Sequence, residues 1–431
     1  MKKNIIKTAL KCHWKYSFFA CIFLFTVGIH AQTTTKTFTK ELNVTNYTTM
    51  ISKGPYSMGF KMNGRIDLNI GGGKFSITPG SNDGIAALTI EEYQIFTWNE
   101  SKVRQTVEIS ITADEDVPQD AQKLMDNLKI NLELDANNKL RIDDNMNIAS
   151  FGFSNGWFTS NESFIVLDDG KKYVIKSINI KSSLHIPKKS NLELTSKYIP
   201  IIIGDIEGQV HLNVNNTTLK MGNIEQLEAS ILSSRAEFQS ITNAKINGVS
   251  SEIKTGCIAN LLIGSDYFLS ENISNDDLIA GGKQHSYATN YRIEEVEEIT
   301  ISKTTFDKFI IGKVANLTSL ESTFSDYTIN KLTTKLLLSA KNGDLRIESI
   351  TESFETIALD NDISSIYLGM NTSPHYTLKL FPNKYTEYDL PSGLISLPET
   401  GLWEKAYIKG DKKQAGTIVI QCHDCKVTVK D

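Results

Sequence analysis

Apolar residues recur at a fixed step through the second half of the chain. The columns that keep this step are Val296, Val314, Leu332 and Ile350; Phe309, Tyr327, Leu345 and Ile363; and Ile311, Ile329 and Ile347. A fixed step of about 18 residues is typical of stacked architectures, in which each unit buries its apolar face on its neighbours. The pattern predicts a β-solenoid that resembles a parallel β-helix.

A related pattern begins upstream. Gly204-Asp205-Ile206 recurs as Gly222-Asn223-Ile224, and Ile241 and Ile258 follow at a slightly shorter step. Gly or Asn beside a buried Ile fits a tight corner, because both residues tolerate left-handed backbone angles. A rung of about 18 residues holds three short strands, and parallel rungs stack about 4.8 Å apart. We expect the solenoid to span residues 187–431.

Residues 32–186 predict a β-rich region that contains one short helix. Period-2 alternation in this region is typical of half-buried strands. Residues 118–128 instead place Ala121, Leu124, Met125 and Leu128 at helical spacing, after Pro118 in the first turn. The predicted fold class is therefore all-β. Strand patterns at Gly416–Ile420 and 426–429 predict the last rung.

Residues 1–31 have the organisation of a signal peptide. Five lysines precede a short apolar run, and Ala31 precedes a plausible cleavage position. Removal of this segment takes five lysines and no acid, so the formal net charge goes from −5 to −10. An acidic chain is a poor partner for nucleic acid or anionic membranes. We expect an exported bacterial protein, in the periplasm or at the cell surface, without membrane insertion after cleavage.

Residues 266–292 interrupt the rungs with polar and aromatic residues. Insertions in a solenoid become loops on one side of the stack, and such loops often carry binding sites. The predicted partner-binding residues are Tyr267, Phe268, His285, Tyr287 and Tyr291, because aromatic side chains contribute strongly to recognition. The alternative is an insertion without a binding role.

Three carboxylates keep the same step as the apolar columns: Asp326, Asp344 and Asp362. If they stack at the strand spacing, they repel by about 1 kcal/mol per pair in water. Lys308 one rung earlier, water or a calcium ion would relieve this repulsion. The favoured alternative is that the three residues form corners, where Asp suits the backbone. Catalysis by such carboxylates is a third possibility, and the sequence predicts no catalytic residue.

Three cysteines follow the targeting segment. Cys422 and Cys425 are close in sequence, and export exposes them to oxidising conditions, so we expect a disulfide. The alternatives are free thiols, half of a zinc site, or a redox pair. A structural zinc site needs four ligands, and the histidines are scattered along the chain. Cys257 remains, and we expect it to be buried as a small apolar residue.

Several short motifs resemble a family of exported bacterial proteins of uncharacterised function that are grouped as adhesins. The matching motifs are Thr97-Trp98-Asn99, the helix at 121–128, Ile186-Pro187-Lys188-Lys189, Gly204-Asp205-Ile206 and the strand at 416–420. The resemblance covers most of the chain after the targeting segment, and it implies a β-solenoid in the cell envelope. The cysteine pair and the polar segment at 266–292 depart from the family pattern. No catalytic residue comes with the family.

These observations predict a non-catalytic, adhesin-like protein of the cell envelope or surface. It would present a rigid β-solenoid face to a glycan or protein partner. One alternative is a periplasmic scaffold or envelope-state sensor. Another is a carbohydrate-active enzyme, which would need two carboxyls flanking a cleft.

Overall fold

The computed structural model contains strands along almost its whole described length. It describes residues 33–44, 93–113, 116–134, 169–197, 200–264, 285–370 and most of 372–431, with short strands between residues 49 and 167. The predicted targeting segment, residues 1–31, lies outside the described residues. Within them the secondary structure consists of strands and one α-helix, so the all-β prediction is confirmed.

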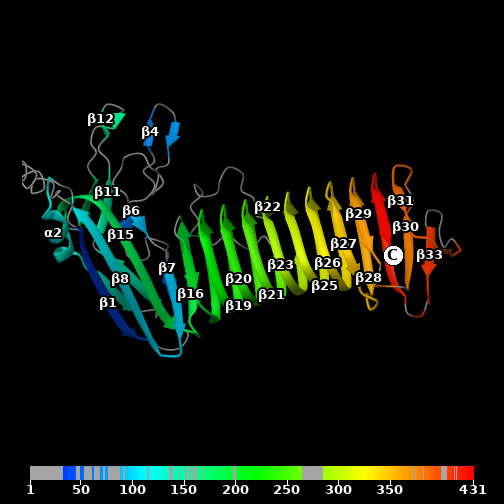
Figure 1. The fold of residues 1–431 in the computed structure, drawn as a ribbon, viewed down its shortest axis with the longest axis horizontal. Helices are drawn as coiled ribbons and strands as arrows, with labels where there is room; N and C mark the ends of the chain where they lie inside the picture. Colours follow the sequence, from blue (N-terminus) through cyan, green and yellow to red (C-terminus); the bar gives the residue numbers. More distant parts are fainter. Residues whose placement is uncertain are drawn as a thin grey trace, which may run out of the picture.

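An antiparallel sheet begins the described chain (Figure 1). Strand β1 (Thr33–Asn43) pairs with β8 (Lys102–Ala113), which also pairs with β15 (Lys172–Pro187). Alternate residues of β8 are buried, and helix α2 (Asp120–Asn127) contacts all three strands through its apolar stripe. The predicted helix over 118–128 is therefore confirmed, with slightly shorter bounds.

Two strands of the N-terminal region form the first layer of the parallel stack that follows. β2 pairs in parallel with β16 (Asn191–Lys197), and β7 pairs in parallel with β17 (Ile201–Ile203). The strands between β1 and β15, apart from β8, are β2 (Thr49–Ser52), β3 (Lys61–Met62), β4 (Leu68–Ile70), β5 (Gly73–Phe75), β6 (Leu88–Ile90), β7 (Tyr93–Trp98), β9 (Ile130–Leu134), β10 (Lys139–Asp144), β11 (Met146–Ser150), β12 (Phe153–Ser154), β13 (Trp157–Phe158) and β14 (Ser163–Leu167). The N-terminal region thus covers one edge of the stack.

Parallel rungs continue along the molecule in a single row (Figure 1). Their strands are β18 (Ile206–Asn215), β19 (Thr218–Leu232), β20 (Arg235–Val249), β21 (Glu252–Ile263), β22 (Ser286–Tyr287), β23 (Asn290–Ile301), β24 (Thr304–Thr305), β25 (Lys308–Thr323) and β26 (Asp326–Lys341). Ile206, Ile224, Ile241 and Ile258 pair in register, and so do Val296, Val314, Leu332 and Ile350. The register predicted for these columns is confirmed.

Each rung turns at a residue in the left-handed backbone conformation. The corner residues, all with φ between 47° and 59°, are Asn216, Ser233, Ser250, Ala288, Phe306, Phe324, Asn342, Ile363 and Asp424. Apart from Asp424, each donates its backbone N–H to the carbonyl of the residue before the next corner. Ser233, for example, donates to Val249 at 2.8 Å. The corners therefore form one hydrogen-bonded column.

A second column, of buried polar residues, directly follows the corners. Its members include Thr217, Ser234, Ser251, Thr289, Asp307, Ser325 and Ser364. The backbone N–H of Ser234 donates to the Ser251 hydroxyl at 3.1 Å, and the N–H of Asp307 donates to the Ser325 hydroxyl at 3.1 Å. These side chains satisfy backbone groups that the tight corner would otherwise leave unpaired.

The C-terminal strands lie inside the stack rather than at its end. β34 (Gly416–His423) and β35 (Lys426–Lys430) pair on one side with β28 (Thr356–Asp362) and β29 (Ser365–Gly369), and on the other with β30 (Tyr376–Phe381) and β31 (Glu387–Asp389). The prediction of residues 416–429 as the last rung is therefore wrong. The 18-residue period does not extend to these strands, so periodicity could not predict their order in the stack.

An antiparallel strand covers the outer edge of this end. β33 (Lys405–Lys409) pairs with β30 and with β32 (Ile395–Ser396). Such a strand blocks the unpaired parallel edge, where further chains would otherwise add. The stack is thus closed by an antiparallel strand at this end and by the N-terminal region at the other.

Two predicted placements differ from the structure. Ile363 does not continue the column of Leu345, because the rung after β27 (Leu345–Ile350) is longer and Leu345 pairs with Ile366. Cys257 is exposed rather than buried, since it alternates with the inward-facing Ile258. In addition, residues 285–292 of the predicted insertion over 266–292 belong to the stack, and residues 266–284 lie outside the described residues.

Candidate functional site

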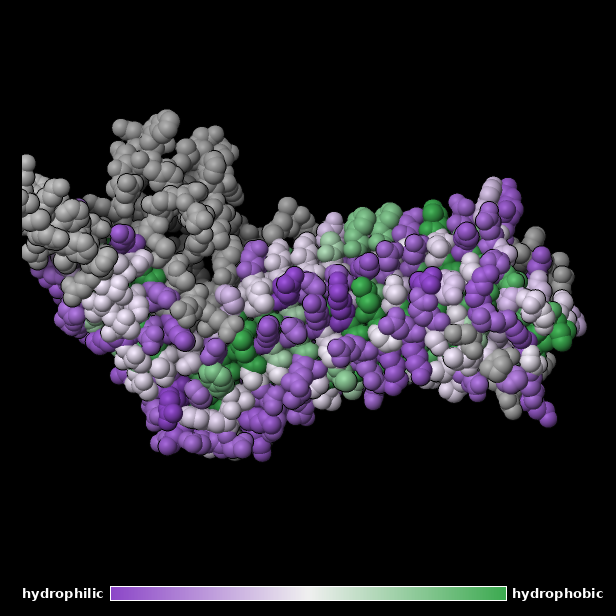
Figure 2. Space-filling view, in the orientation of Figure 1, coloured by the Kyte–Doolittle hydropathy of each residue, from purple (hydrophilic) through white to green (hydrophobic). Residues whose placement is uncertain are grey.

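Bulky apolar side chains occupy three of the corners in the second half of the stack. Phe306, Phe324 and Ile363 are 50%, 48% and 56% exposed, and each has a positive φ. Tyr287 contacts Phe306, and we refer to Tyr287, Phe306, Phe324 and Ile363 as the apolar ridge. Figure 2 shows apolar side chains gathered along the edge of the stack where the strands end.

The backbone at these corners disfavours such residues. A left-handed conformation costs an L-residue about 1–2 kcal/mol, while Gly, Asn and Asp adopt it most readily. Phe306, Phe324 and the β-branched Ile363 therefore sit in a conformation that their side chains oppose, and half of each side chain faces solvent. Neither backbone preference nor burial explains the choice of these residues, and strained outliers of this kind cluster at functional sites.

The aromatic rings of the ridge are stacked on one another. The Phe306 and Phe324 ring centroids are 4.9 Å apart with an interplanar angle of 9°. Tyr287 meets Phe306 at 5.7 Å and 86°, as an edge contact. Each phenylalanine therefore covers one face of the other, so fewer open ring faces remain for sugar C–H groups, which favour the electron-rich face. This arrangement suits an apolar protein segment better than a glycan.

The predicted partner-binding residues fall into three groups. Tyr267 and Phe268 lie outside the described residues. His285 is half-buried, and a ring nitrogen of it lies 3.3 Å from the Thr305 hydroxyl, while Tyr287, also half-buried, belongs to the ridge. Tyr291 is only 1% exposed, so its assignment as a contact residue is wrong.

Tyr291 instead belongs to an aromatic stack inside the rungs. Its ring lies 4.9 Å from that of Phe309, which lies 4.8 Å from that of Tyr327. The Tyr291 hydroxyl is 2.6 Å from that of Ser286, and it accepts a hydrogen bond from the Gly248 N–H at 3.2 Å. Burial raises the pKa of Tyr291 and raises that of Tyr327 to about 12. Tyr291 lies in this stack because the parallel register pairs it with Phe309 of the next rung.

A buried carboxyl lies beside this aromatic stack. Asp307 is 2% exposed and accepts a hydrogen bond from the Thr289 N–H at 2.6 Å and one from the Thr304 hydroxyl. Burial raises the pKa of Asp307 to about 6, against the lowering effect of these hydrogen bonds. The group thus changes charge near neutral pH within a part of the molecule that excludes water.

The three aspartates predicted to stack do not form one column. Asp326 lies opposite Lys308, as predicted, and its carboxylate accepts the N–H of Asp344 at 3.1 Å. The carboxylate of Asp344 accepts the N–H of Ser365 at 3.0 Å. Asp362 pairs with Lys341 on the other side of a corner, because the rung is longer there.

The favoured corner interpretation therefore agrees with the contacts of Asp326 and Asp344, and the predicted column of three is wrong. No group of three or more His, Cys, Asp or Glu side chains in the described part of the chain is arranged to hold a metal ion.

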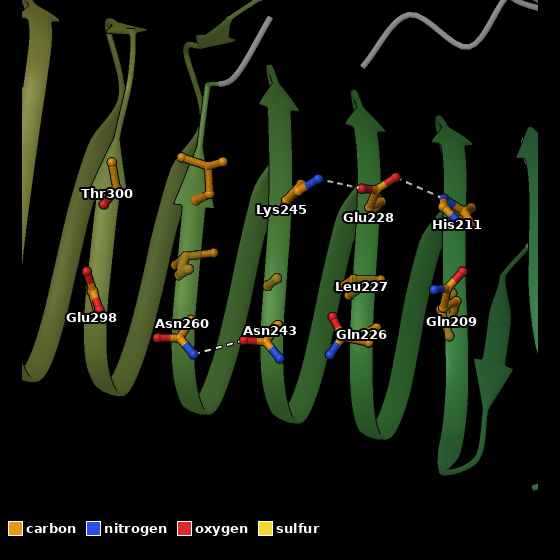
Figure 3. A pocket seen from close by; sticks show the side chains of 14 residues that line it. Gln209, His211, Gln226, Leu227, Glu228, Asn243, Lys245, Asn260, Glu298 and Thr300 are labelled. Carbon is orange, nitrogen blue, oxygen red and sulfur yellow. Dashed lines mark hydrogen bonds and ion pairs between the residues drawn. The ribbon is translucent and has the colours of Figure 1, made fainter. Parts of the chain in front are cut away.

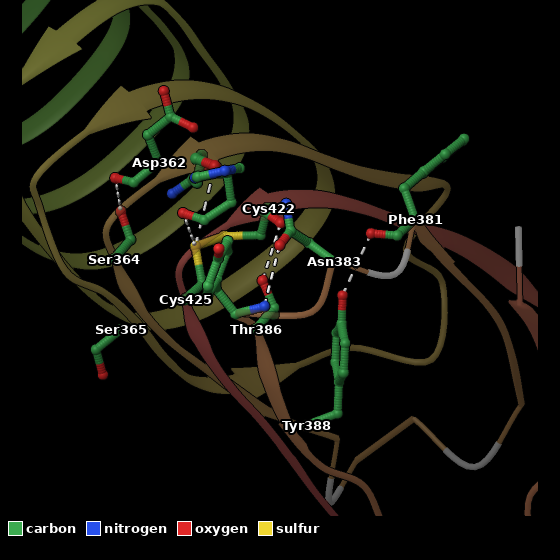
Figure 4. Close-up of a disulfide and its surroundings, with 12 residues drawn as sticks. Asp362, Ser364, Ser365, Phe381, Asn383, Thr386, Tyr388, Cys422 and Cys425 are labelled. Atoms are coloured by element: carbon green, nitrogen blue, oxygen red, sulfur yellow. Dashed lines mark hydrogen bonds between the residues drawn. A yellow bond between two sulfur atoms is a disulfide. The ribbon is translucent and has the colours of Figure 1, made fainter. Parts of the chain in front are cut away.

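A disulfide joins Cys422 and Cys425 across the corner at Asp424 (Figure 4). The rungs on both sides contact this corner. On one side, the Thr386 hydroxyl donates to the Cys422 carbonyl at 3.0 Å, and the N–H of Glu387 donates to the Cys425 carbonyl at 2.8 Å. The bridge occupies the position that Ser364 holds in the neighbouring rung.

A shallow groove of about 490 Å³, which we call the carboxamide groove, lies on the outer face of the first rungs, with polar side chains in two rows above apolar residues of the same strands (Figure 3). One row of its lining contains Gln209, Gln226, Asn243, Asn260 and Glu298, and the second contains His211, Glu228, Lys245, Leu262 and Thr300. Successive members of each row pair in register from rung to rung. The groove thus runs along the stack, and none of its lining residues belongs to the ridge.

Comparisons with known proteins add little to these observations. No family model matches the chain, and no curated protein matches it. One solved structure, called a "putative cell adhesion protein" and from Clostridium sporogenes ATCC 15579, covers 92% of this chain and 99% of its own at 8% identity and a TM-score of 0.15. A likeness this distant carries no argument about fold or function. Among the described residues, no helix is long and apolar enough to cross a membrane.

The sequence contains a signal for the ridge in two short polar segments, each of which includes one phenylalanine. Thr304-Thr305-Phe306-Asp307 and Ser322-Thr323-Phe324-Ser325 are separated by one step of the repeat, and each places a phenylalanine among polar residues. An apolar residue at a position that otherwise reads as a corner marks a side chain that the fold does not bury.

Proposed function

We propose that this chain is a non-catalytic, adhesin-like binding protein of the cell envelope or surface, and that its apolar ridge contacts a protein partner. The observation that carries the proposal is the set of bulky side chains at left-handed corners, Phe306, Phe324 and Ile363. They destabilise the backbone locally and gain little burial in return. A partner that covers them would supply the missing burial, at about 25 cal/mol per Å² of apolar surface.

We further propose that the parallel stack is a continuous β-solenoid that holds the ridge rigid. Support comes from the register, which links each rung to the next on both sides of residues 265–284. The corner hydrogen bonds link the same rungs. Neighbouring corners in such a frame stay at a fixed spacing, so a partner meets a preorganised surface and loses little affinity to ordering it.

Site-specific photo-crosslinking in the cells that make the protein tests the ridge. A photoreactive phenylalanine analogue replaces Phe306 or Phe324 in turn, and the matched control carries it at Ser233, an exposed corner of the first half. We expect a discrete adduct with another protein from positions 306 and 324 and none from 233. Equal adducts from all three positions, or none from the ridge, would contradict the proposal.

The mass of the adduct separates the possible occupants. An adduct of twice the chain mass identifies a second copy as the occupant, which would replace the adhesin-like function with self-association. The double variant F306N/F324N should keep the fold, because asparagine tolerates a left-handed corner. We expect it to abolish binding of the identified partner while its circular dichroism spectrum and melting temperature stay near those of the parent.

Protease treatment of intact cells addresses where the binding occurs. Loss of the chain while a periplasmic control protein survives would indicate a surface adhesin. Survival of both, together with failure of antibodies to label intact cells, would instead favour a periplasmic scaffold.

A further inference from the structure

The carboxamide groove has a chemistry different from that of the apolar ridge. Its first row carries four carboxamides in consecutive rungs, Gln209, Gln226, Asn243 and Asn260, which face the same side of the strands (Figure 3). Each carboxamide offers two N–H donors and one carbonyl acceptor. The Asn260 side-chain N–H donates to the Asn243 carbonyl oxygen at 2.8 Å, which leaves further donors and acceptors along the row.

Charges in the second row are balanced within the groove. Glu228 lies between Lys245 and His211, with its carboxylate oxygens 2.8 Å from the Lys245 ammonium and 3.1 Å from the His211 ring. The Lys245 hydrogen bond lowers the pKa of Glu228, against the effect of burial. The one lysine of the lining is therefore paired with a carboxylate, and Glu298 adds a negative charge at one end. This balance disfavours a polyanionic ligand.

The groove repeats the same chemistry at a fixed interval. Parallel rungs are separated by about 4.8 Å, which is close to the length of one sugar unit in an extended polysaccharide. A ligand that lies along the first row would meet a carboxamide at each of four consecutive rungs. Leu262, which is half-buried in the second row, adds an apolar contact for C–H groups. A repeating polar ligand therefore fits better than a compact small molecule.

From these observations we infer that the groove binds a neutral polysaccharide chain laid along the stack. Sugar hydroxyls both donate and accept hydrogen bonds, as carboxamides do, so the two sets of groups match without a net charge. The groove is shallow and its lining contains no Phe, Tyr or Trp, so affinity accumulates over several sugar units rather than at one. This site is separate from the ridge and does not depend on the proposed protein partner.

Affinity electrophoresis of the full chain in gels that contain soluble neutral polysaccharides tests this inference. The probes are dextran, mannan, galactan and a mixed-linkage β-glucan, with alginate as the polyanionic comparison. We expect at least one neutral polysaccharide to slow the chain and alginate to leave its mobility unchanged. Hexasaccharides of that polysaccharide should compete better than disaccharides, because they span more rungs.

The double variant Q226A/N243A removes two central carboxamides. Losing the binding free energy of about one hydrogen bond weakens binding about tenfold. We therefore expect the affinity to fall at least about tenfold. Q239A is the matched control, because Gln239 is an exposed glutamine of β20 outside the groove, and its affinity should stay within about twofold.

Three outcomes would overturn the inference: no neutral polysaccharide retards the chain, Q226A/N243A binds as the parent does, or alginate binds more strongly than every neutral probe. The ridge variant F306N/F324N should bind the polysaccharide as the parent does. Failure of the protein-partner proposal and failure of this one can therefore be told apart.

Discussion

The two halves of the parallel stack carry different residues at equivalent corner positions. In the first half the left-handed positions carry Asn216, Ser233 and Ser250, which are small and polar. In the second half Phe306 and Phe324 occupy the equivalent positions of the same hydrogen-bonded column. Because the backbone geometry is shared, the difference lies in what the exposed side chains contribute.

This contrast separates what the fold requires from what it merely tolerates. The first half follows local preference, since Asn and Ser suit corners. The second half departs from it at Phe306, Phe324 and Ile363, where the side chain gains little burial, although Asn342 still follows it. Consistency across levels is expected of a sequence that only has to fold, so a repeated departure points to function. The four carboxamides of the groove lie on the half with regular corners and the ridge on the other, so the proposed surfaces occupy different parts of the stack.

The interiors of the two halves also differ. The buried polar column contains only hydroxyl side chains at Thr217, Ser234 and Ser251, whereas the second half places Asp307 in the same column. The second half also stacks three rings, with Phe309 at the centre. We therefore expect the second half to depend more strongly on aromatic packing and on pH.

The largest expected effect comes from removing the central ring. Phe309→Ala should lower the free energy of unfolding by about 3–5 kcal/mol through lost burial and a cavity. Each aromatic pair that it breaks adds about 0.5–1.5 kcal/mol. Urea denaturation followed by circular dichroism measures the change.

Phe238→Ala is the matched control in the first half. Phe238 is equally buried, at 1% exposure, but its cross-rung neighbours are Met221 and Thr255 rather than aromatic rings. We expect this variant to lose less stability than Phe309→Ala by about 1–3 kcal/mol. Equal losses would show that ring stacking contributes nothing beyond burial and would remove this part of the contrast.

The next effect concerns the pH dependence that Asp307 gives the second half. Burial raises the pKa of this carboxyl from 3.8 to about 6, so the folded protein holds the proton more tightly than the unfolded chain. Stability from this group is therefore full below about pH 4 and is lost as the pH rises through about 6. At about 1.4 kcal/mol per pKa unit, the loss is about 3 kcal/mol.

Asp307→Asn should remove this loss, because an amide keeps an acceptor for the Thr289 N–H and never ionises. The variant should be more stable than the parent at about pH 7, and the gap should shrink as the pH falls towards 4. Chemical denaturation of both proteins across this range provides the measurement. A gap that is constant with pH would contradict a buried carboxyl that titrates.

The corner at Asp424 differs from the others because a covalent bond spans it. The disulfide between Cys422 and Cys425 closes a loop of about four residues, for which the chain-entropy model gives about 2 kcal/mol. The double variant C422S/C425S should lose stability by that amount under non-reducing conditions, while Cys257→Ser should leave stability unchanged. A titration of three free thiols in the unfolded, unreduced chain would refute the disulfide.

Sequence periodicity predicted the regular part of this fold well. The column of Val296, Val314 and Leu332 gives the observed register directly, because an identical step places residues opposite one another in parallel rungs. The helix near residues 118–128 was also predictable from its apolar stripe. These signals are local or strictly repeating, so a single sequence contains them.

Features that depend on distant segments were not predictable. The insertion of β34 between β28 and β30 pairs segments far apart in the chain with no repeating step. The longer rung after Leu345 moved Ile363 from the expected core to an exposed corner. Tyr291 looked like a binding residue because aromatic character alone does not tell a contact from a core ring. The ridge could be predicted only from apolar residues at corner positions, where Gly, Asn or Asp is preferred.

The smallest expected effect tests the corner preference itself, at two neighbouring positions of the same column. Ile363 has φ 49° and is more than half exposed, and Asn342, with φ 54°, precedes it in the column. Ile363→Asn should raise the free energy of unfolding by about 1 kcal/mol, because asparagine tolerates this conformation and little burial is lost. Asn342→Ile should lower it by a similar amount, as measured by urea denaturation.

Opposite signs for this reciprocal pair would show that the fold alone favours asparagine at both corners. Ile363 would then be retained against stability, which is the pattern expected where function and stability conflict. If Ile363→Asn also weakens binding of the partner identified by crosslinking at Phe324, the ridge extends to this corner. A loss of stability in both variants would instead mean that Ile363 is held by packing, and the ridge would end at Phe324.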